Sequence, residues 1–261
     1  MTEILITGAT DGIGRAAAEL LAGAGHTLLL HGRNGEKLAA VAAACAPAPV
    51  ECFTADFSVM AEVAALATRL AERGAPEVII NNAGILKASP ETTADGLDIR
   101  IAVNTLAPYL LTRHLRPLMP EGGRVVNVSS AAQAPVEMEA LATPASRPAM
   151  AAYAQSKLAI LMWGRHMAET PGASIIGVNP GSLLGSKMVR DGFGVAGGDL
   201  SVGARILAEA ATGARFESAN GQYFDNDAGR FGRPHQDALD PGKCARLTAA
   251  LDDILSRLGV A

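Results

Sequence analysis

The sequence predicts an α/β fold built on one doubly wound parallel sheet with helices on both faces. Short apolar runs alternate with segments of helical periodicity along all 261 residues, which is the pattern of consecutive βαβ units. The apolar runs contain few polar residues, as expected for parallel strands that helices cover on both faces. No break in composition and no fixed-period repeat divides the chain, so we expect a single domain over residues 1–261.

The elements follow one another in regular order. Apolar runs of strand length predict strands, and apolar residues recurring with a period near 3.6 predict helices. The expected strands are residues 3–7, 27–31, 50–55, 77–80, 124–128, 174–178 and 221–224. The expected helices are residues 12–24, 35–45, 59–73, 93–115, 151–169, 201–211 and 242–258. Pro117 and Pro120 end the long fourth helix, because proline removes a backbone donor and clashes with the preceding turn.

Two stretches, residues 133–150 and 181–198, lack a regular period. Each follows an expected strand, so each should lie at the carboxyl edge of the sheet, where open α/β sheets bind ligands. We therefore expect both to be substrate loops. The first holds Pro135, Pro144 and Pro148 and is expected to be a mobile lid or pocket wall, since long irregular loops in compact domains are usually functional.

Composition excludes several classes of protein. Hydrophobic residues make up 49% of the chain, and no apolar run approaches the length of a membrane span. The net charge of -4 without a basic block argues against a nucleic-acid partner. The first residues resemble a strand rather than a secretory signal, and Cys45, Cys52 and Cys244 are scattered, which favours reduced thiols and a cytoplasmic location.

A glycine-rich loop follows the first expected strand. In Thr7-Gly8-Ala9-Thr10-Asp11-Gly12-Ile13-Gly14, Gly8 suits a tight turn, Gly12 a close approach of backbone to a pyrophosphate, and Gly14 close packing of helix on strand. The helix that follows offers free N–H groups and a partial positive charge to phosphates. An ordinary glycine-rich turn is the alternative, but the flanking strand and helix favour a dinucleotide site in a Rossmann-type sheet.

The end of the second strand bears on the choice of dinucleotide. NAD-binding folds commonly place an Asp or Glu there, on the ribose 2′-hydroxyl. This chain has Arg33 and Asn34 instead. A guanidinium suits a 2′-phosphate, so we expect NADP(H) to be preferred over NAD(H), unless Arg33 is only a solvated loop residue. Arg15 is a second and weaker candidate for phosphate binding.

A tyrosine and a lysine lie four positions apart on the helix expected at residues 151–169. Tyr153 and Lys157 therefore share a face of that helix. A tyrosine acting as a base near pH 7 needs a lowered pKa, and an ammonium beside it favours the phenolate. We expect Lys157 to lower the pKa of Tyr153; the alternative is a surface tyrosine beside an unrelated neighbour.

With these motifs, the chain resembles the short-chain dehydrogenase/reductase family over essentially its whole length. The glycine loop is similar to the family's T-G-x-x-x-G-x-G signature, residues 81–84 to its N-N-A-G element, and Tyr153 with Lys157 to its Y-x-x-x-K pair. Asp56-Phe57 resembles the pair that meets the adenine, and Asn179-Pro180-Gly181 the turn that abuts the nicotinamide.

The resemblance implies the site residues. The catalytic residues would be Asn104, which anchors a water of the proton relay, Ser130, which binds the substrate oxygen, Tyr153 and Lys157. The cofactor-binding residues would be Gly8, Thr10, Asp11, Gly12, Ile13, Gly14, Arg33, Asn34, Asp56, Phe57, Asn82, Ala83, Gly84, Tyr153, Lys157, Pro180, Gly181 and Ser186. The implied activity is NADP-dependent interconversion of a ketone or aldehyde and an alcohol.

Two departures from the family pattern affect the substrate end. Tyr153 follows Ser130 by 23 positions, longer than is usual, which places an insertion over the pocket and is similar to the retinol-dehydrogenase-like branch. Gly185 stands where the family usually has a threonine that binds the carboxamide, and the adjacent Ser186 is the expected substitute. The alternatives are reduction or isomerisation of another bond, such as an enoyl group, and a non-catalytic NADP-sensing module.

The remaining expectations concern metals, partners and oligomers. The histidines show no metal-ligand spacing, so no metal is expected. Asp225, Asp227, Asp252 and Asp253 are expected to cap helices or face solvent. The substrate should be a small, apolar carbonyl or alcohol. The low charge of residues 151–162 suggests a helix face buried against another subunit, hence a homodimer or homotetramer, although an interior helix would look the same.

Overall fold

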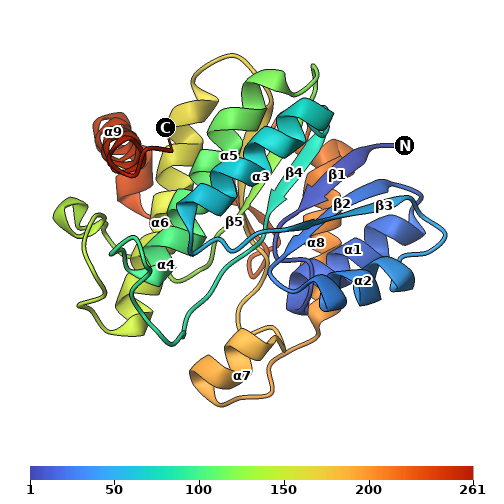
Figure 1. Cartoon of the computed structure of the whole chain (residues 1–261), viewed down its shortest axis with the longest axis horizontal. Helices are drawn as coiled ribbons and strands as arrows, with labels where there is room; N and C mark the ends of the chain where they lie inside the picture. The colour runs from blue at the N-terminus through green and yellow to red at the C-terminus, as the bar shows by residue number, and fades with distance from the viewer. Residues whose placement is uncertain (261) are drawn as a thin grey trace.

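The computed structural model describes residues 1–260 and shows one eight-stranded sheet with helices on both faces (Figure 1). The strands are β1 (Glu3–Ile6), β2 (Thr27–Gly32), β3 (Val50–Thr54), β4 (Val78–Asn81), β5 (Arg124–Val128), β6 (Ser174–Asn179), β7 (Tyr223–Asp225) and β8 (Arg230–Gly232). Their order across the sheet is β3-β2-β1-β4-β5-β6-β7-β8. Neighbouring strands pair in parallel except β8, which is antiparallel to β7. The predicted doubly wound α/β fold is confirmed.

Nine α-helices are present in the described residues. They are α1 (Gly12–Gly23), α2 (Gly35–Ala44), α3 (Met60–Arg73), α4 (Ile99–Ile101), α5 (Ala107–Leu115), α6 (Ala149–Ala168), α7 (Lys187–Phe193), α8 (Leu200–Thr212) and α9 (Pro241–Arg257). Helices α1, α2 and α8 cover one face of the sheet, and α3, α5 and α6 cover the other (Figure 1). Helix α9 packs outside α6, while the short α7 projects from the body (Figure 1).

The period of two along each strand produces two cores. In β1, Leu5 points into the core beneath α3, α5 and α6, while Ile4 and Ile6 point into the core beneath α1 and α8. All three side chains are fully buried. Since successive side chains of a strand point to opposite faces, an unbroken apolar run is what a strand between two helical layers needs.

Short polar side chains mark where several helices begin. Asp11 accepts a hydrogen bond from the Gly12 N–H at the start of α1, and Asn34 accepts one from the Lys37 N–H at the start of α2. Asp240 accepts one from the Lys243 N–H at the start of α9. These bonds satisfy backbone donors that have no partner within the helix.

The expected helix at residues 93–115 is the main difference in the body of the fold. Helix begins only at Ile99, after Asp98 accepts a hydrogen bond from the Arg100 N–H, and the segment before it forms an isolated bridge between Thr92 and Asp98. A π-helical turn, Ala102–Leu106, then separates α4 from α5. The periodicity extended the expected helix too far because it cannot detect this buried cap.

The two irregular stretches are partly structured. Helix α7 lies within the stretch at residues 181–198. Strand β8 lies outside both stretches, and the sequence did not indicate it. None of the helices in residues 1–260 is long and apolar enough to cross a bilayer. Within the same residues, no group of His, Cys, Asp or Glu side chains is arranged to hold a metal ion.

Candidate active site

The glycine loop joins β1 to α1 at the carboxyl edge of the sheet. Gly8 and Gly12 have φ angles of +67° and +56°, in the left-handed region that favours glycine. A Cβ atom at Gly14 would lie 2.3 Å from Asn82 Nδ2 and 2.4 Å from Gly8 O, so only a hydrogen fits there. The first-turn N–H groups of α1 have no acceptor within the helix. The loop therefore fits a dinucleotide pyrophosphate, as its glycine spacing predicts.

A second loop, the N-N-A-G element after β4, fixes the first. Thr7 Oγ1 accepts hydrogen bonds from the N–H groups of Asn82 (3.0 Å) and Ala83 (3.1 Å). Asn82 Nδ2 donates to the carbonyl oxygens of Thr7 (2.9 Å) and Gly8 (3.1 Å). Asn82 and Ala83 thus hold the glycine loop in shape through backbone contacts.

Three other residues of the glycine loop have structural contacts of their own. A Cβ atom at Gly32 would lie 2.6 Å from Thr10 Cγ2, so Thr10 sits directly against the end of β2. Ile13 lies against α8, where a Cβ at Gly203 would come within 3.2 Å of Ile13 Cγ2. Asp11 is exposed and caps α1.

Arg33, at the end of β2, is exposed and lies near one carboxylate. Its Nη1 is 3.9 Å from Asp56 Oδ2, and its side chain is 66% exposed. The other oxygen of Asp56 accepts hydrogen bonds from the N–H and Oγ of Ser58. The side-chain oxygen of Asn34 is occupied in capping α2. Of Arg33 and Asn34, Arg33 is therefore the one whose side chain is available to bind a phosphate.

His31 is a residue of this edge that the sequence reasoning did not assign to the site. Its Nδ1 accepts a hydrogen bond from the Gly8 N–H (3.4 Å), and its Nε2 lies 3.0 Å from the carbonyl oxygen of Ala55. The ring stacks on Phe57 at a centroid distance of 4.0 Å. Burial lowers the pKa of His31 to about 4, so the ring is neutral near pH 7 and donates from Nε2. Phe57 is buried, and its ring is packed against His31.

Asn104 lies in the π-helical turn and is completely buried. Its Oδ1 accepts from the Ile85 N–H (2.8 Å), and its Nδ2 donates to Ile85 O and Ser156 Oγ (2.9 Å each). Ser156 Oγ in turn donates to the carbonyl oxygen of Tyr153 (2.7 Å). Asn104 therefore connects the loop after β4 to the helix that carries Tyr153.

Lys157 is buried, and its amine lies where β4 and β5 end. Its Nζ donates to the carbonyl oxygen of Val128 (2.8 Å) and would lie 3.3 Å from a Cβ at Gly84. The Nζ is 5.7 Å from the centroid of the Tyr153 ring. Ser130 lies two residues after the end of β5, and its Oγ accepts from the Ala132 N–H (3.1 Å). The structure thus brings Ser130, Tyr153 and Lys157 to the same edge as the glycine loop.

The pKa values differ from the simplest expectation. Burial raises the pKa of Tyr153 above its ordinary value, and hydrogen bonding with Ser130 opposes this rise. Burial lowers the pKa of Lys157 to about 8. Desolvation therefore outweighs any favourable effect of Lys157 on the Tyr153 phenolate.

The turn after β6 completes this edge. Pro180 is buried, and Gly181 has a φ of +128°, which only glycine adopts readily. Ser186 Oγ accepts from the Val189 N–H and so caps α7, while its Cβ would lie 3.5 Å from a Cβ at Gly12. Ser186 thus lies beside the glycine loop, and its hydroxyl already has a structural partner.

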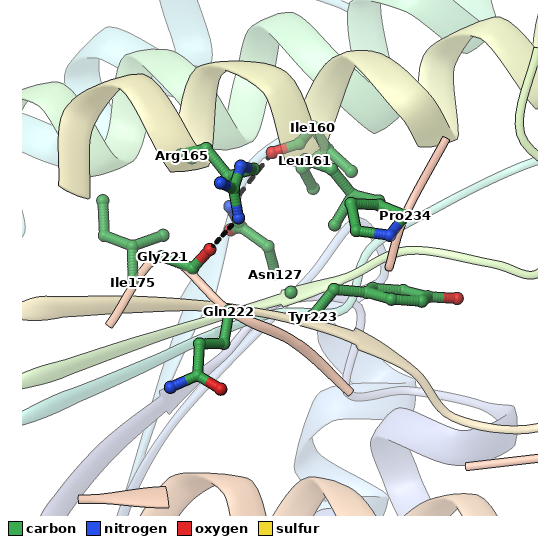
Figure 2. A pocket seen from close by; sticks show the side chains of 11 residues that line it. Asn127, Ile160, Leu161, Arg165, Ile175, Gly221, Gln222, Tyr223 and Pro234 are labelled. Atoms are coloured by element: carbon green, nitrogen blue, oxygen red, sulfur yellow. Dashed lines mark hydrogen bonds between the residues drawn. The ribbon is translucent and has the colours of Figure 1, made fainter. Parts of the chain in front are cut away.

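A small crevice under α6 is a separate feature (Figure 2). Its volume of about 10 Å³ suits at most one water molecule. Figure 2 shows Arg165 reaching from α6 to the carbonyl oxygen of Gly221, and Asn127 reaching to that of Ile160. We interpret it as a packing gap where α6 crosses the sheet.

Known proteins resemble this chain in sequence and in fold. The family profile described as short chain dehydrogenase matches residues 2–192. Retinol dehydrogenase 12 of Bos taurus is 33% identical over 202 residues, which are 73% of this chain and 64% of that protein. The chain spans between 45% and 65% of the length of four other curated relatives that it matches.

Solved structures of similar fold can be superposed on most of this chain. A short-chain dehydrogenase from Burkholderia cenocepacia J2315, in complex with NADP, has a TM-score of 0.70 at 26% identity and covers 86% of this chain and 95% of its own. The landomycin C-6 ketoreductase LanV, with bound NADP and rabelomycin, has a TM-score of 0.68 at 27% identity and covers 86% and 94%.

Proposed function

The chain belongs to the short-chain dehydrogenase family, and from that premise we propose that it is an NADP-dependent oxidoreductase that interconverts a ketone or aldehyde and the corresponding alcohol. The observation that carries the proposal is the convergence of Ser130, Tyr153 and Lys157 beside the glycine loop, with Lys157 Nζ on the Val128 carbonyl. The NADP complexes among the similar structures, and the ketoreductase named for one of them, support the cofactor and the reaction class.

The residues present fit a dinucleotide. The glycine loop and the N-terminus of α1 would hold the pyrophosphate, Arg33 would meet a 2′-phosphate, and the turn at Pro180 and Gly181 would border the nicotinamide. The substrate loops at residues 133–150 and 181–198 would form the walls around the substrate. When bound, the dinucleotide supplies or accepts the hydride, which no side chain can do.

The chain's own residues handle the proton. Ser130 Oγ donates a hydrogen bond to the substrate oxygen and orients it toward Tyr153. In the reducing direction Tyr153 Oη donates its proton to that oxygen, and in the oxidising direction it removes the proton. The raised pKa of Tyr153 keeps it protonated near neutral pH, which suits the role of acid in carbonyl reduction. Lys157 and Asn104 fix the helix and loops around Tyr153.

The test is a screen of ketones, aldehydes and secondary alcohols with NADPH or NADP, followed at the absorbance of the reduced nicotinamide. Tyr153→Phe removes the proton carrier and little surface, so kcat should fall at least about 100-fold while NADPH binding is retained. Tyr109→Phe is a matched control, because Tyr109 donates to Asp252 on α9, away from the site. NADPH binding without turnover of any substrate would favour a sensing module instead, and activity of Tyr153→Phe within twofold of wild type would remove Tyr153 from the mechanism.

Location and assembly remain proposals. A cytoplasmic location is supported by Cys45, Cys52 and Cys244, which are all free thiols. An oligomer was expected from the low charge of α6, but α9 packs against α6 within the same chain. The mass in solution, by light scattering, would decide between a monomer and a homodimer or homotetramer.

A further inference from the structure

The segment after β7 is bound tightly to the turn after β6. Strands β6 and β7 pair as far as Asn179 and Asp225, and the Asn226 N–H then donates to the Asn179 carbonyl (3.1 Å). Asn226 Nδ2 donates to the carbonyl oxygen of Pro180 (2.9 Å). We refer to residues 225–227 as the strap.

Asp227 makes the other contacts of the strap. Its Oδ1 accepts from the Ser182 N–H (2.8 Å), and its Oδ2 accepts from Ser182 Oγ (2.5 Å) and Asn179 Nδ2 (3.0 Å). Asn179 Nδ2 also donates to Asp225 Oδ1 (2.9 Å). Asp227 is exposed, as expected, but its carboxylate also binds Ser182 of the turn after β6. Asp225 is half-buried, and its carboxylate binds Asn179 at the end of β6.

The turn needs an external support. Pro180 has no N–H to donate, Gly181 has a φ of +128°, and Leu183 is the one non-glycine residue of positive φ (+51°) in the described chain. A positive φ costs free energy at Leu183, though not at a glycine, and such conformations persist where the surroundings hold them. Hydrogen bonds to a carboxylate are about twice as strong as neutral ones, so Asp227 is well suited to hold them.

The strap itself has a rigid base. Asp225 pairs with Arg230 of β8, which closes the chain into a hairpin. Beneath it, Phe224 and Phe231 pack at a centroid distance of 5.2 Å, and the Arg215 guanidinium lies 4.4 Å from the Phe224 ring centroid. The strap therefore links the turn by hydrogen bonds to a well-packed hairpin.

We propose that Asp227 is a positioning residue that, with Asn226, holds the turn at residues 180–182 in the conformation that contacts the nicotinamide end of the cofactor. This inference rests on the proposed function, because it takes that turn to border the nicotinamide. Support comes from the place of the turn: Ser129 N–H donates to the Val178 carbonyl beside it, and Ser186 lies against Gly12 of the glycine loop. The adenine end, at Arg33, lies on another part of the edge, beyond β1.

The test compares ligands that occupy different parts of the site. NADPH reaches the turn, whereas 2′,5′-ADP carries only the adenosine end with its phosphates. In Asp227→Ala, calorimetry should show NADPH binding weakened about tenfold, the equivalent of one charged hydrogen bond, with 2′,5′-ADP binding unchanged. Asp227→Asn keeps one acceptor for the Ser182 N–H and should fall between. Asp253→Ala, which removes an exposed carboxylate from α9, is the control and should match wild type in both.

A kinetic readout separates positioning from general loosening. With NADPH deuterated at the transferred position, Asp227→Ala should show a larger isotope effect on kcat than wild type, because poor positioning slows hydride transfer itself. Equal weakening of NADPH and 2′,5′-ADP, or unchanged NADPH binding with an unchanged isotope effect, would overturn the role of Asp227. Failure of the wild type to bind NADPH would instead overturn the proposed function, so the two failures are distinguishable.

Discussion

Lys157 shows how one side chain can serve the site at a cost to the fold. Its amine is buried, with a hydrogen bond to the Val128 carbonyl, and burial lowers its pKa to about 8 from 10.5. Below pH 8 Lys157 is protonated in both the folded and the unfolded chain, so folding must remove a charged ammonium from water, which lowers the stability of the fold. Between pH 8 and 10.5 only the unfolded chain holds the proton, so this group makes stability rise with pH.

Lys157→Met tests that sign. The variant lacks the buried charge, so its free energy of unfolding should exceed that of wild type by up to about 3 kcal/mol below pH 8, less the value of the lost hydrogen bond. The advantage should shrink as pH rises from 8 to 10.5, because wild type gains stability there. Urea unfolding at pH 7, 9 and 10 measures it; a difference that stays constant or grows with pH would contradict the buried charge.

Arg33 acts at the opposite end of the proposed cofactor site. Arg33→Ala should weaken NADPH binding roughly tenfold and leave NADH binding nearly unchanged, because only NADPH has a 2′-phosphate. Arg257→Ala is the matched control, since Arg257 is an exposed arginine on α9 and not a residue of the proposed cofactor site. Fluorescence titration of both dinucleotides decides it, and equal losses for the two would mean that Arg33 does not read the phosphate. Gly32 is unsuitable for such a test, because Thr10 leaves no room for a side chain there.

At the scale of elements, the loop over residues 133–150 is held by hydrogen bonds to α6, the helix that carries Tyr153. Gln155 of α6 donates to Glu137 Oε1 (3.0 Å) and accepts from the Glu137 N–H (3.2 Å), while Arg147 donates to Glu137 Oε2 (2.9 Å). The hydrogen bonds from Arg147 and Gln155 lower the pKa of Glu137. Gln133 also ties the loop to the Ser130 carbonyl. These contacts support a pocket wall rather than a freely mobile lid.

Glu137→Ala should release that wall. Losing the hydrogen bonds that Glu137 makes with Arg147 and Gln155 should change relative kcat/KM among substrates several-fold, with KM for NADPH unaffected. The exposed Glu139 lies in the same loop, so Glu139→Ala is the control. Steady-state kinetics over a panel of carbonyl substrates provides the measurement. If every substrate changes by the same factor, residues 133–150 do not select among substrates.

At the scale of the whole molecule, α9 completes the core that lies beneath α6. Leu251 of α9 is fully buried in it, and Asp252 accepts from Tyr109 Oη (2.7 Å) while pairing with Arg113 (3.2 Å), both on α5. The low charge of α6 is thus explained within one chain. This removes the reason for expecting an oligomer, although the oligomeric state itself stays a prediction.

Leu251→Ala measures the contribution of that contact. Removing a fully buried leucine side chain should lower the free energy of unfolding by about 2 to 5 kcal/mol. Leu20→Ala on α1 is the matched control; Leu20 is 42% exposed. Its substitution should change stability by less than about 0.5 kcal/mol. Denaturant unfolding followed by circular dichroism compares them, and equal effects would show that α9 does not stabilise the core.

Sequence alone determined the features that depend on neighbouring residues. Strand and helix periods are local, and they predicted the alternation and the parallel sheet. The glycine spacing predicted the loop because positive φ and the missing Cβ are properties of single residues, as at Gly8, Gly12 and Gly14. Tyr153 and Lys157 were paired because one helical turn separates them.

Tertiary structure decided what depends on residues far apart in the chain. The helix starts at Ile99 because Asp98 and Arg100 pair in the core, and β8 exists only because β7 lies beside it. His31 supports Gly8 through contacts 23 positions away, and Asp227 holds Ser182 from 45 positions away. The direction in which the pKa of Tyr153 shifts depends on its burial, which no local sequence pattern indicates. The physical reason is the same in each case: desolvation and hydrogen-bond partners are set by packing between elements, and sequence periodicity describes only one element at a time.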